Sequence, residues 1–137
     1  MTDFNEFNRG VVDEFRANEG KVTGMFAGAP MILVTHRGAK SGKEYTSPLV
    51  YTRDGDAHVI IASKGGAPDD PQWFRNMVAN PDVTVEVGAE KFAARARVAE
   101  GAERDRLFRA QADAMPNFDE YATKTTRTIP VVVLERT

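Results

Sequence analysis

Hydrophobic side chains recur every three or four residues near the start of the chain, which is the spacing of one face of a helix. Residues 2–19 carry Phe4, Phe7, Val11 and Phe15 at this spacing, so we predict an amphipathic helix there. Its polar face is acidic rather than basic. The stripe is therefore expected to cover a core or a partner subunit, and contact with a membrane surface is the less favoured alternative.

Three more helices are predicted in the second half of the chain, over residues 71–79, 102–114 and 117–124. Pro71 suits the first turn of a helix, and Pro81 restricts the residue before it, so these prolines set the limits of the first of the three. The second is charged and amphipathic, and the third is short.

Alternation of apolar and polar residues, or a short apolar run, predicts strands elsewhere. Six strands are expected: Met31–His36, Tyr45–Arg53, Ala57–Ser63, Val83–Val87, Phe92–Val98 and Ile129–Leu134. Asp54-Gly55 is a strong signal for a tight hairpin between the second and third of them. Most connections between strands are short, which favours a mainly antiparallel sheet. We therefore predict one domain over residues 1–137, mainly β with flanking helices, as a small barrel or half-open barrel.

Composition narrows the function without identifying it. A chain of 137 residues with 28% charged side chains and a net charge of −2 is typical of a globular domain, and this balance argues against a nucleic-acid partner held through its phosphates. The absence of cysteine excludes a disulfide and a thiol nucleophile. No apolar run approaches the ~20 residues of a membrane span, and the polar start does not resemble a signal peptide, so a cytoplasmic location is expected.

The two histidines, His36 and His58, lie on separate predicted strands. No carboxylate–histidine pair at helical spacing accompanies them, so no metal site is predicted. No nucleophile-elbow sequence is present either, which argues against a hydrolytic triad. Both histidines are interpreted as strand residues with local partners.

The stretch from Gly38 to Lys43 (Gly-Ala-Lys-Ser-Gly-Lys) connects the first two predicted strands and carries the strongest electrostatic signal. From Arg37 to Arg53 the chain has four basic residues and one acid, Glu44, a local charge of about +3 (4 − 1). Two glycines and a serine are expected to leave its backbone amides accessible, and such amides with lysines suit a phosphate or carboxylate. A solvated hairpin loop is the alternative. The stretch is not a P-loop, because a strand rather than a helix follows it.

A second glycine-rich connection, Ser63-Lys64-Gly65-Gly66, follows the third predicted strand, and Trp73 and Asn76 come soon after it, one helical turn apart. If the two loops meet at one rim, that rim offers amides, two lysines, a hydroxyl and an indole. Amides and lysines fit an anion, and an indole fits a planar ring. For Trp73 alone, core packing is the alternative.

Six segments of the chain, taken in order, resemble one known family. They are Gly-Ala-Lys-Ser-Gly (38–42), Ser-Pro-Leu-Val-Tyr (47–51), Ala-Ser-Lys-Gly-Gly (62–66), Pro-Gln-Trp-Phe-Arg-Asn (71–76), Ala-Asn-Pro (79–81) and Arg-Thr-Ile-Pro-Val-Val (127–132). Together they resemble the deazaflavin-dependent nitroreductase family of actinobacteria, over most of the chain from about residue 22 onward. Each segment is weak alone, but the ordered set is specific.

The resemblance implies a split β-barrel like that of FMN-binding proteins, often dimeric. It implies coenzyme F420, a deazaflavin with a phosphate and an oligoglutamate tail, and hydride transfer from its reduced form to quinones, nitro compounds or enones. The cofactor-binding residues that it implies are Ala39, Lys40, Ser41, Gly42, Lys43 and Tyr45 near the phosphate, Pro48, Ile61, Ala62 and Ser63 along the ring, and Lys64, Gly65, Trp73 and Asn76 completing the wall. The substrate side would carry Met115, Phe118 and Tyr121.

The chain departs from the family's nitro-activating member at several of these positions. That member has arginine at the position of Tyr45 and tyrosine at those of Val50, Met115 and Phe118. Activation of bulky nitroimidazoles is therefore less expected than reduction of a quinone or another small acceptor.

Hydride transfer from a deazaflavin requires the protein mainly to set distance and angle. As the acceptor gains negative charge, Ser63 or Tyr121 could donate a hydrogen bond to its oxygen, so these two are the catalytic candidates. Two other functions stay open, an FMN-binding oxidoreductase on the same barrel and a deazaflavin-binding protein without catalysis. The expected partner is a quinone-like small molecule; a homodimer and a peripheral location at the inner membrane face are secondary expectations.

Overall fold

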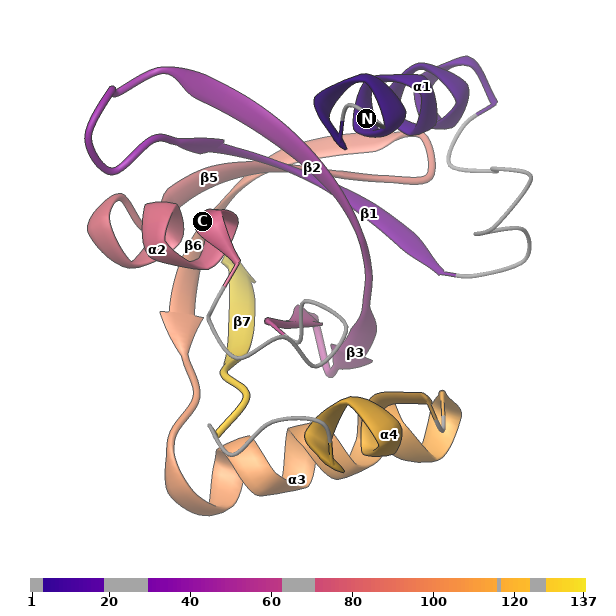
Figure 1. Ribbon diagram of the computed structural model, residues 1–137, viewed down its shortest axis with the longest axis vertical. Coiled ribbons are helices and arrows are strands. Elements are labelled where there is room, and N and C mark those ends of the chain that lie inside the picture. The colour runs from indigo at the N-terminus through magenta and orange to yellow at the C-terminus, as the bar shows by residue number, and fades with distance from the viewer. Residues whose placement is uncertain (1–3, 19–29, 63–70, 116, 124–127) are drawn as a thin grey trace.

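The computed structural model describes residues 4–18, 30–62, 71–115, 117–123 and 128–137. Its elements, in chain order, are α1 (Phe4–Ala17), β1 (Met31–Arg37), β2 (Glu44–Val50), β3 (Thr52–Asp54), β4 (Ala57–Ile61), α2 (Gln72–Ala79), β5 (Asp82–Val87), β6 (Glu90–Val98), α3 (Gly101–Ala114), α4 (Asn117–Thr123) and β7 (Val131–Arg136). The strands form one curved sheet, with helices packed around it (Figure 1). The prediction of a mainly β fold with flanking helices is confirmed.

The sheet runs in the order β2-β1-β5-β6-β7-β4-β3, and every pair of neighbours is antiparallel. Its two edge strands, β2 and β3, are consecutive in the chain and are separated only by Tyr51. Chain continuity therefore brings the two edges of the sheet back together, and the sheet closes into a half-barrel of the split-barrel type.

The number of strands was predicted wrongly, because the segment Tyr45–Arg53 is two strands and not one. β2 pairs with β1 as far as Val50 opposite Met31. Met31 is the first residue of β1, so β1 offers no further partner beyond this point. The N–H of Tyr51 donates to the carbonyl of Pro30 (3.1 Å), and the chain then turns to pair with β4. The sheet consequently has seven strands.

The other predicted elements agree with the structure to within two residues at each end. The hairpin signal at Asp54-Gly55 is confirmed, since Gly55 adopts a φ of 61° in the turn between β3 and β4. This left-handed conformation suits a residue without a Cβ. Pro71 was expected in the first turn of the helix, but it is the extended residue immediately before α2, which begins one residue later.

Apolar side chains pack on both faces of the sheet. One cluster lies between α2 and strands β1, β5 and β7 and includes Ile32, Met77 and Leu134. A second joins β4 and β7 to α3 and α4 and includes Ile61 and Phe118. These clusters fix the two helical layers relative to the strands that carry the predicted site.

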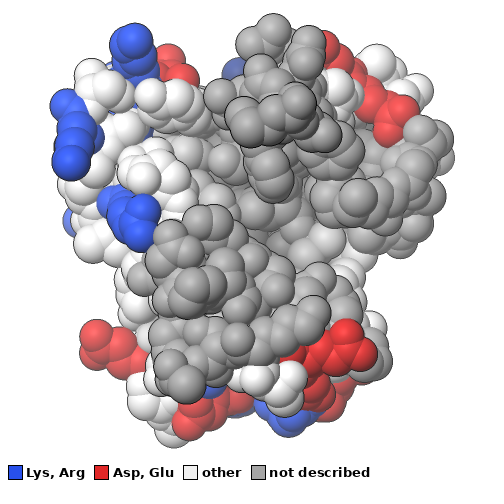
Figure 2. Space-filling view, in the orientation of Figure 1, with Lys and Arg blue, Asp and Glu red and all other residues white. Residues whose placement is uncertain are grey.

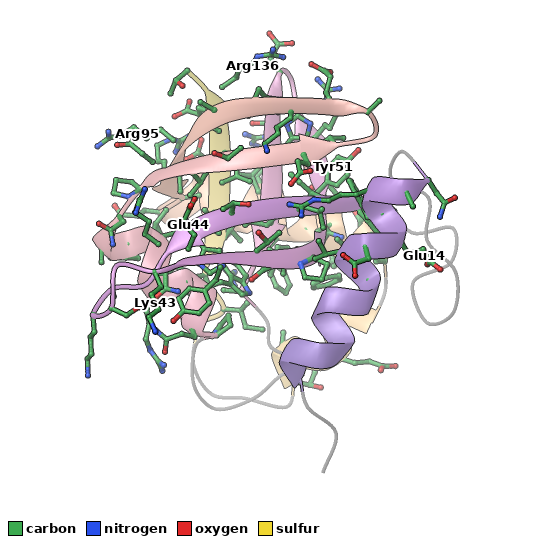
Figure 3. The ribbon with its side chains drawn as sticks, turned by 90° about the horizontal axis from the view of Figure 1, so that it is seen from above. Glu14, Lys43, Glu44, Tyr51, Arg95 and Arg136 are labelled. Carbon is green, nitrogen blue, oxygen red and sulfur yellow. The ribbon has the colours of Figure 1, made fainter. Side chains whose placement is uncertain are left out.

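The first helix covers the sheet, as its hydrophobic stripe predicts. Val12 and Phe15 are buried against Met31 and Leu33 of β1. Figure 3 shows α1 lying across the strands of this face, with Glu14 pointing away from them. None of the helices in the described ranges is long and apolar enough to span a membrane.

An ion pair adds to this packing. The Arg16 guanidinium donates two hydrogen bonds to the carboxylate of Glu86 on β5, at 3.1 and 2.8 Å. Simple alternation places Glu86 on the face opposite Val85, yet Glu86 is buried because α1 covers that face. The pair raises the pKa of Arg16, chiefly through its hydrogen bond to Glu86.

Candidate active site

The loop between β1 and β2 is a compact turn. The N–H of Gly38 donates to the carbonyl of Lys43 (2.8 Å), and the N–H of Gly42 donates to the carbonyl of Gly38 (3.0 Å). The N–H of Lys43 donates to Ser41 Oγ (3.2 Å). A Cβ at Gly38 would lie 2.5 Å from Ser41 Oγ, so a larger residue there would require the serine side chain to shift. Gly42 adopts a φ of 70°, which also favours glycine.

The turn uses more of its own amides than the sequence suggests. Gly38, Gly42 and Lys43 donate within the turn, and Ala39 donates to α2, as described below. Among the described residues, no acceptor lies within hydrogen-bonding distance of the N–H groups of Lys40 or Ser41. The accessible amides are therefore these two at the tip of the turn, rather than the whole stretch.

The positive charge at this turn comes from fewer residues than the count along the sequence. Arg37, Lys40 and Lys43 are exposed around it. Arg53, counted in the same group, lies in β3, and the whole of β2, about 23 Å long at 3.3 Å per residue, lies between β3 and the turn. Lys43 and Tyr51, which lie at opposite ends of β2, show this separation in Figure 3.

The space-filling view shows how the charges separate over the molecule. Blue side chains gather over the end of the β1–β2 pair, whereas red side chains are frequent along α3 and α4 (Figure 2). An anion is therefore attracted to the β1–β2 end of the molecule even though the chain carries a net negative charge.

Asn76, on α2, ties this turn to the body of the protein. Its Oδ1 accepts a hydrogen bond from the N–H of Ala39 (3.0 Å) and another from Gln72 Nε2 (3.0 Å). Its Nδ2 lies 3.1 Å from Nδ1 of His36, whose Nε2 lies 2.9 Å from Ser47 Oγ. Asn76 and His36 are 2% and 3% exposed, so the turn rests on a buried polar network.

The resemblance implied that Asn76 completes the cofactor wall, which stays a prediction; the structure shows its side chain buried beneath the turn. His36 was interpreted as a strand histidine with local partners, which Ser47 and Asn76 confirm. Burial lowers the pKa of His36 to about 4, so its imidazole is neutral at physiological pH. Gln72 and Ser47 were missed as part of this network.

A sequence signal for His36 existed, because it shares the buried face of β1 with Ile32 and Val34 at two-residue spacing. A polar side chain on a buried strand face needs a partner. The partner itself could not be read from the sequence, since Asn76 is 40 residues away.

Tyr45 supports the same turn. Its ring stacks on that of His36, with the centroids 6.1 Å apart, and its hydroxyl lies 3.4 Å from Ser41 Oγ. The side chain is 46% exposed. The residues predicted near the phosphate, from Ala39 to Tyr45, therefore come together at one corner of the barrel.

The residues predicted along the ring lie on or just after β2 and β4, two strands that do not pair with each other, and Trp73 of the predicted wall lies on α2. Pro48 lies on β2 opposite Leu33, and Ile61 ends β4 opposite Val131 of β7. Ala62 follows β4, fully buried, and its N–H donates to the carbonyl of Pro130 (2.9 Å). Trp73 is half-buried, packs against the cluster of α2 and the sheet, and meets Phe74 edge-to-face. Core packing, the alternative for Trp73, thus describes part of its surface.

The residues predicted on the substrate side belong to the helical hairpin of α3 and α4. Phe118 is 4% exposed and lies in the same cluster as Ile61, with Met115 partly buried against it. Tyr121 belongs to α4. Arg109 of α3 holds α4 through two hydrogen bonds to Asp119, at 3.1 and 2.6 Å.

Ser63, Lys64 and Gly65 lie outside the described residues, so the expected meeting of the two glycine-rich loops stays a prediction. A surface hollow of about 430 Å³ lies elsewhere, lined by residues of α2, β6, α3 and the segment before β7, including Phe74, Arg104 and Pro130. None of the predicted site residues lines it.

Comparisons with known proteins identify the family of the chain. The sequence matches the F420H2-dependent quinone reductase family over residues 7–136. An F420H2-dependent quinone reductase of Mycobacterium tuberculosis is 40% identical over 126 residues, covering 89% of this chain and 85% of the relative.

Solved structures share the fold of this chain. An F420H2-dependent reductase (FDR-A) is 41% identical, covers 77% of this chain and 94% of its own, and superposes with a TM-score of 0.72. A protein described as a domain-swapped dimer is 36% identical, with 95% and 96% of the two chains covered and a TM-score of 0.74. HutZ, the heme storage protein of Vibrio cholerae, is only 12% identical but covers 95% of this chain and 90% of its own with a TM-score of 0.60, which shows the shared split-barrel fold.

The predicted family, with its oxidoreductase class and its deazaflavin cofactor, is thus confirmed at the level of the family. A match over residues 7–136 and a relative at 40% identity together leave one assignment: the chain belongs to the F420H2-dependent quinone reductase family.

Proposed function

We propose that this protein is an F420H2-dependent reductase that transfers hydride to quinones, with nitro compounds and enones as further acceptors. The observation that carries the proposal is the β1–β2 turn, in a chain of this family: it is basic, it rests on a buried polar support, and two of its amides have no acceptor among the described residues. The family name specifies the reductant and the acceptor class, and the turn supplies a place for an anionic cofactor.

The donor set at the turn fits the phosphorylated tail of the cofactor. Phosphate oxygens accept hydrogen bonds from backbone N–H groups and are attracted to lysine ammonium groups. The N–H groups of Lys40 and Ser41 are free for this among the described residues, and the side chains of Lys40 and Lys43 are exposed beside them. Lys40, Ser41 and Gly42, with Ala39, Lys43 and Tyr45 alongside, are proposed to hold the tail.

The deazaflavin, when bound, supplies a hydride that it delivers directly to an acceptor. The chain's own residues then need to orient the ring and exclude water. Pro48, Ile61, Ala62 and Trp73 are proposed to line the ring, continued by Ser63, Lys64 and Gly65.

The acceptor is proposed to lie against the hairpin of α3 and α4. Met115 is partly buried there, and the buried Phe118 fixes the helix that carries Tyr121. Hydride addition places negative charge on the acceptor oxygen, and a proton completes the quinol. Ser63 and Tyr121 are proposed to donate hydrogen bonds to that oxygen. Each donor is expected to stabilise the transition state by about 3 kcal/mol.

The direct test is a titration of the purified protein with F420, FMN and NADPH, followed by oxidation of reduced F420 with menadione. We expect saturable F420 binding and menadione-dependent oxidation. Binding of FMN in place of F420, with flavin absorbance on purification, would support a flavin oxidoreductase on this barrel. Tight F420 binding without turnover on any acceptor would indicate a non-catalytic carrier.

The role of the turn is tested by Lys40→Ala, with Arg53→Ala as the matched control. Loss of one charge-assisted contact is expected to weaken F420 binding about tenfold at low salt, and less at high salt, where the charge is screened. Arg53 lies in β3, away from the turn, so its removal should leave binding unchanged. Equal effects of the two substitutions would place the tail elsewhere.

Two further expectations belong to this proposal. A homodimer is supported by the structural neighbour described as a domain-swapped dimer, and sedimentation of the purified protein tests it. A cytoplasmic location, peripheral to the membrane or not, stays a prediction, which cell fractionation tests.

A further inference from the structure

The amide groups beneath the β1–β2 turn allow one assignment of donor and acceptor to each hydrogen bond of the network. Arg75 donates to Gln72 Oε1 (3.3 Å), so the amide nitrogen of Gln72 is the group that faces Asn76. Asn76 Oδ1 then accepts from Gln72 and from the N–H of Ala39, both at 3.0 Å. A backbone N–H can only donate, and this fixes which end of the Asn76 amide faces the turn.

The same reasoning assigns the imidazole. Because Asn76 Oδ1 is occupied, its Nδ2–H is the donor to Nδ1 of His36 (3.1 Å). Nδ1 is therefore unprotonated, and Nε2 carries the hydrogen and donates it to Ser47 Oγ (2.9 Å). If His36 carried its proton on Nδ1, that N–H would face the Nδ2–H of Asn76. The Asn76 amide would then have to rotate, and its oxygen would leave the N–H of Ala39.

The surroundings of His36 favour this neutral form. Its ring is packed against Tyr45 of β2 and is bounded by Ser47 and Asn76, with the exposed Arg37 next along the strand. None of these groups is a carboxylate that would stabilise a charged imidazole. The buried polar atoms of Asn76 and His36 all have hydrogen-bond partners, whereas Nδ1 of His58 has none among the described residues.

We propose that Asn76 and His36 are a positioning pair for the β1–β2 turn: the Nε2–H tautomer of His36 keeps the Asn76 oxygen on the N–H of Ala39, and this leaves the amides of Lys40 and Ser41 turned out for the anionic ligand. The inference rests on the proposed function where it identifies that ligand as the phosphorylated tail of F420. The geometry of the pair does not depend on that identification.

The first test needs no variant and no cofactor. Nitrogen-15 NMR distinguishes protonated from unprotonated imidazole nitrogens, and the chain has only two histidines to assign. His36 is expected to show a protonated Nε2 and a bare Nδ1 at pH 7. A proton on Nδ1 would overturn the proposal.

The second test changes the partner. Asn76→Asp keeps an oxygen for Ala39 but places an acceptor against Nδ1, so His36 should take up a second proton and its titration midpoint should rise from about 4 to above the ordinary 6.5. Asn76→Ala should instead speed hydrogen exchange of the Ala39 amide. An unchanged titration in the first variant and unchanged exchange in the second would each contradict the pair.

The third test links the pair to the ligand. His36→Phe keeps the stacking on Tyr45 and removes both hydrogen bonds; we expect F420 binding to weaken about tenfold while turnover at saturating cofactor changes little. His58→Phe is the matched control, a substitution of the other buried histidine, and should leave binding unchanged. Equal binding by the wild type and His36→Phe would refute the pair, whereas a wild type that binds no F420 would refute the proposed function and leave the NMR tests standing.

Discussion

The two ends of the barrel that carry the predicted site are held in different ways. At the β1–β2 end, the turn rests on Asn76 and His36, which are buried and neutral. At the α3–α4 end, the buried Phe118 packs α4 against α3, and on the surface Arg109 of α3 pairs with Asp119 of α4 at 2.6 Å and with Asp113 of its own helix at 2.9 Å. All three of these charged side chains are at least half exposed.

This difference has consequences for how each end can adapt. Buried hydrogen bonds have one good geometry and are hardly affected by salt, whereas exposed ion pairs are weak and screened. Under the proposed function, the rigid end meets a cofactor that is always the same, and the adaptable end meets acceptors of different size. The comparison predicts that the two ends respond differently to truncation, pH, backbone change and salt.

The largest effect is expected from the apolar anchor of the α3–α4 end. Phe118 is buried among Ile61, Leu107 and Phe108, so Phe118→Ala should lower the free energy of unfolding by about 3–5 kcal/mol. Urea denaturation measures this. Phe118→Leu fills most of the volume and should cost much less. A loss below about 1 kcal/mol for the alanine variant would mean that the surface ion pairs, rather than packing, hold this end.

The position of the strands could be predicted from the sequence, but the way in which they close the barrel could not. No glycine, asparagine or aspartate interrupts Tyr45–Arg53, so nothing local marks the break at Tyr51. The break arises because β1 begins at Met31, so residues after Val50 have no partner on β1 and pair with β4 instead. Such a change of partner depends on tertiary pairing, which local patterns do not encode.

The same holds for the site. Charge and glycine content located the β1–β2 turn, and the resemblance of the chain to a known family located the residues expected around it. The sequence did not show that Asn76 supports the turn through Ala39, because the two are 37 residues apart. It also overestimated the free amides, since four of the six N–H groups from Gly38 to Lys43 already donate, three within the turn and that of Ala39 to Asn76.

The next effect separates the two ends by pH. The pKa of His36 is lowered by burial from 6.5 to about 4, so the unfolded chain binds more protons than the folded one between these values. Stability should therefore be constant above pH 6.5 and fall by about 3 kcal/mol as the pH drops to 4. Urea unfolding at a series of pH values measures this loss at the β1–β2 end.

The α3–α4 end should respond only at lower pH. Hydrogen bonds from Arg109 and Arg106 lower the pKa values of Asp119 and Asp54 from 3.8. Their stabilisation is complete above the unfolded value and is lost as the pH falls through the folded one. His58 contributes in the same direction as His36, since burial lowers its pKa as well, so the measurement is made on His58→Leu. A flat profile between pH 6.5 and 4 in that variant would contradict the assignment to His36.

A smaller effect is expected at the glycine that closes the turn. Gly38→Ala places a Cβ 2.5 Å from Ser41 Oγ and 3.0 Å from the Tyr45 ring, and the shift that this requires should destabilise the protein by about 1 kcal/mol. Gly10→Ala is the matched control. Nothing lies within 4 Å of a Cβ there, and alanine in a helix should stabilise by about 0.5–1 kcal/mol. Thermal unfolding of both variants measures the contrast. If Gly38→Ala raised the stability as Gly10→Ala is expected to, the turn would have room for the added methyl group.

The smallest effect concerns the surface pairs of Arg109. Arg109→Gln removes its charge and its contacts with Asp113 and Asp119. Because these side chains are exposed, we expect a small loss of stability at low salt that disappears at roughly 1 M NaCl, where the Debye length falls to about 3 Å. Under the same conditions His36→Phe should lose stability independently of salt, since its hydrogen bonds join neutral groups. A loss in Arg109→Gln that persists at high salt would mean that the guanidinium acts through packing, and the two ends of the barrel would then be held by similar forces.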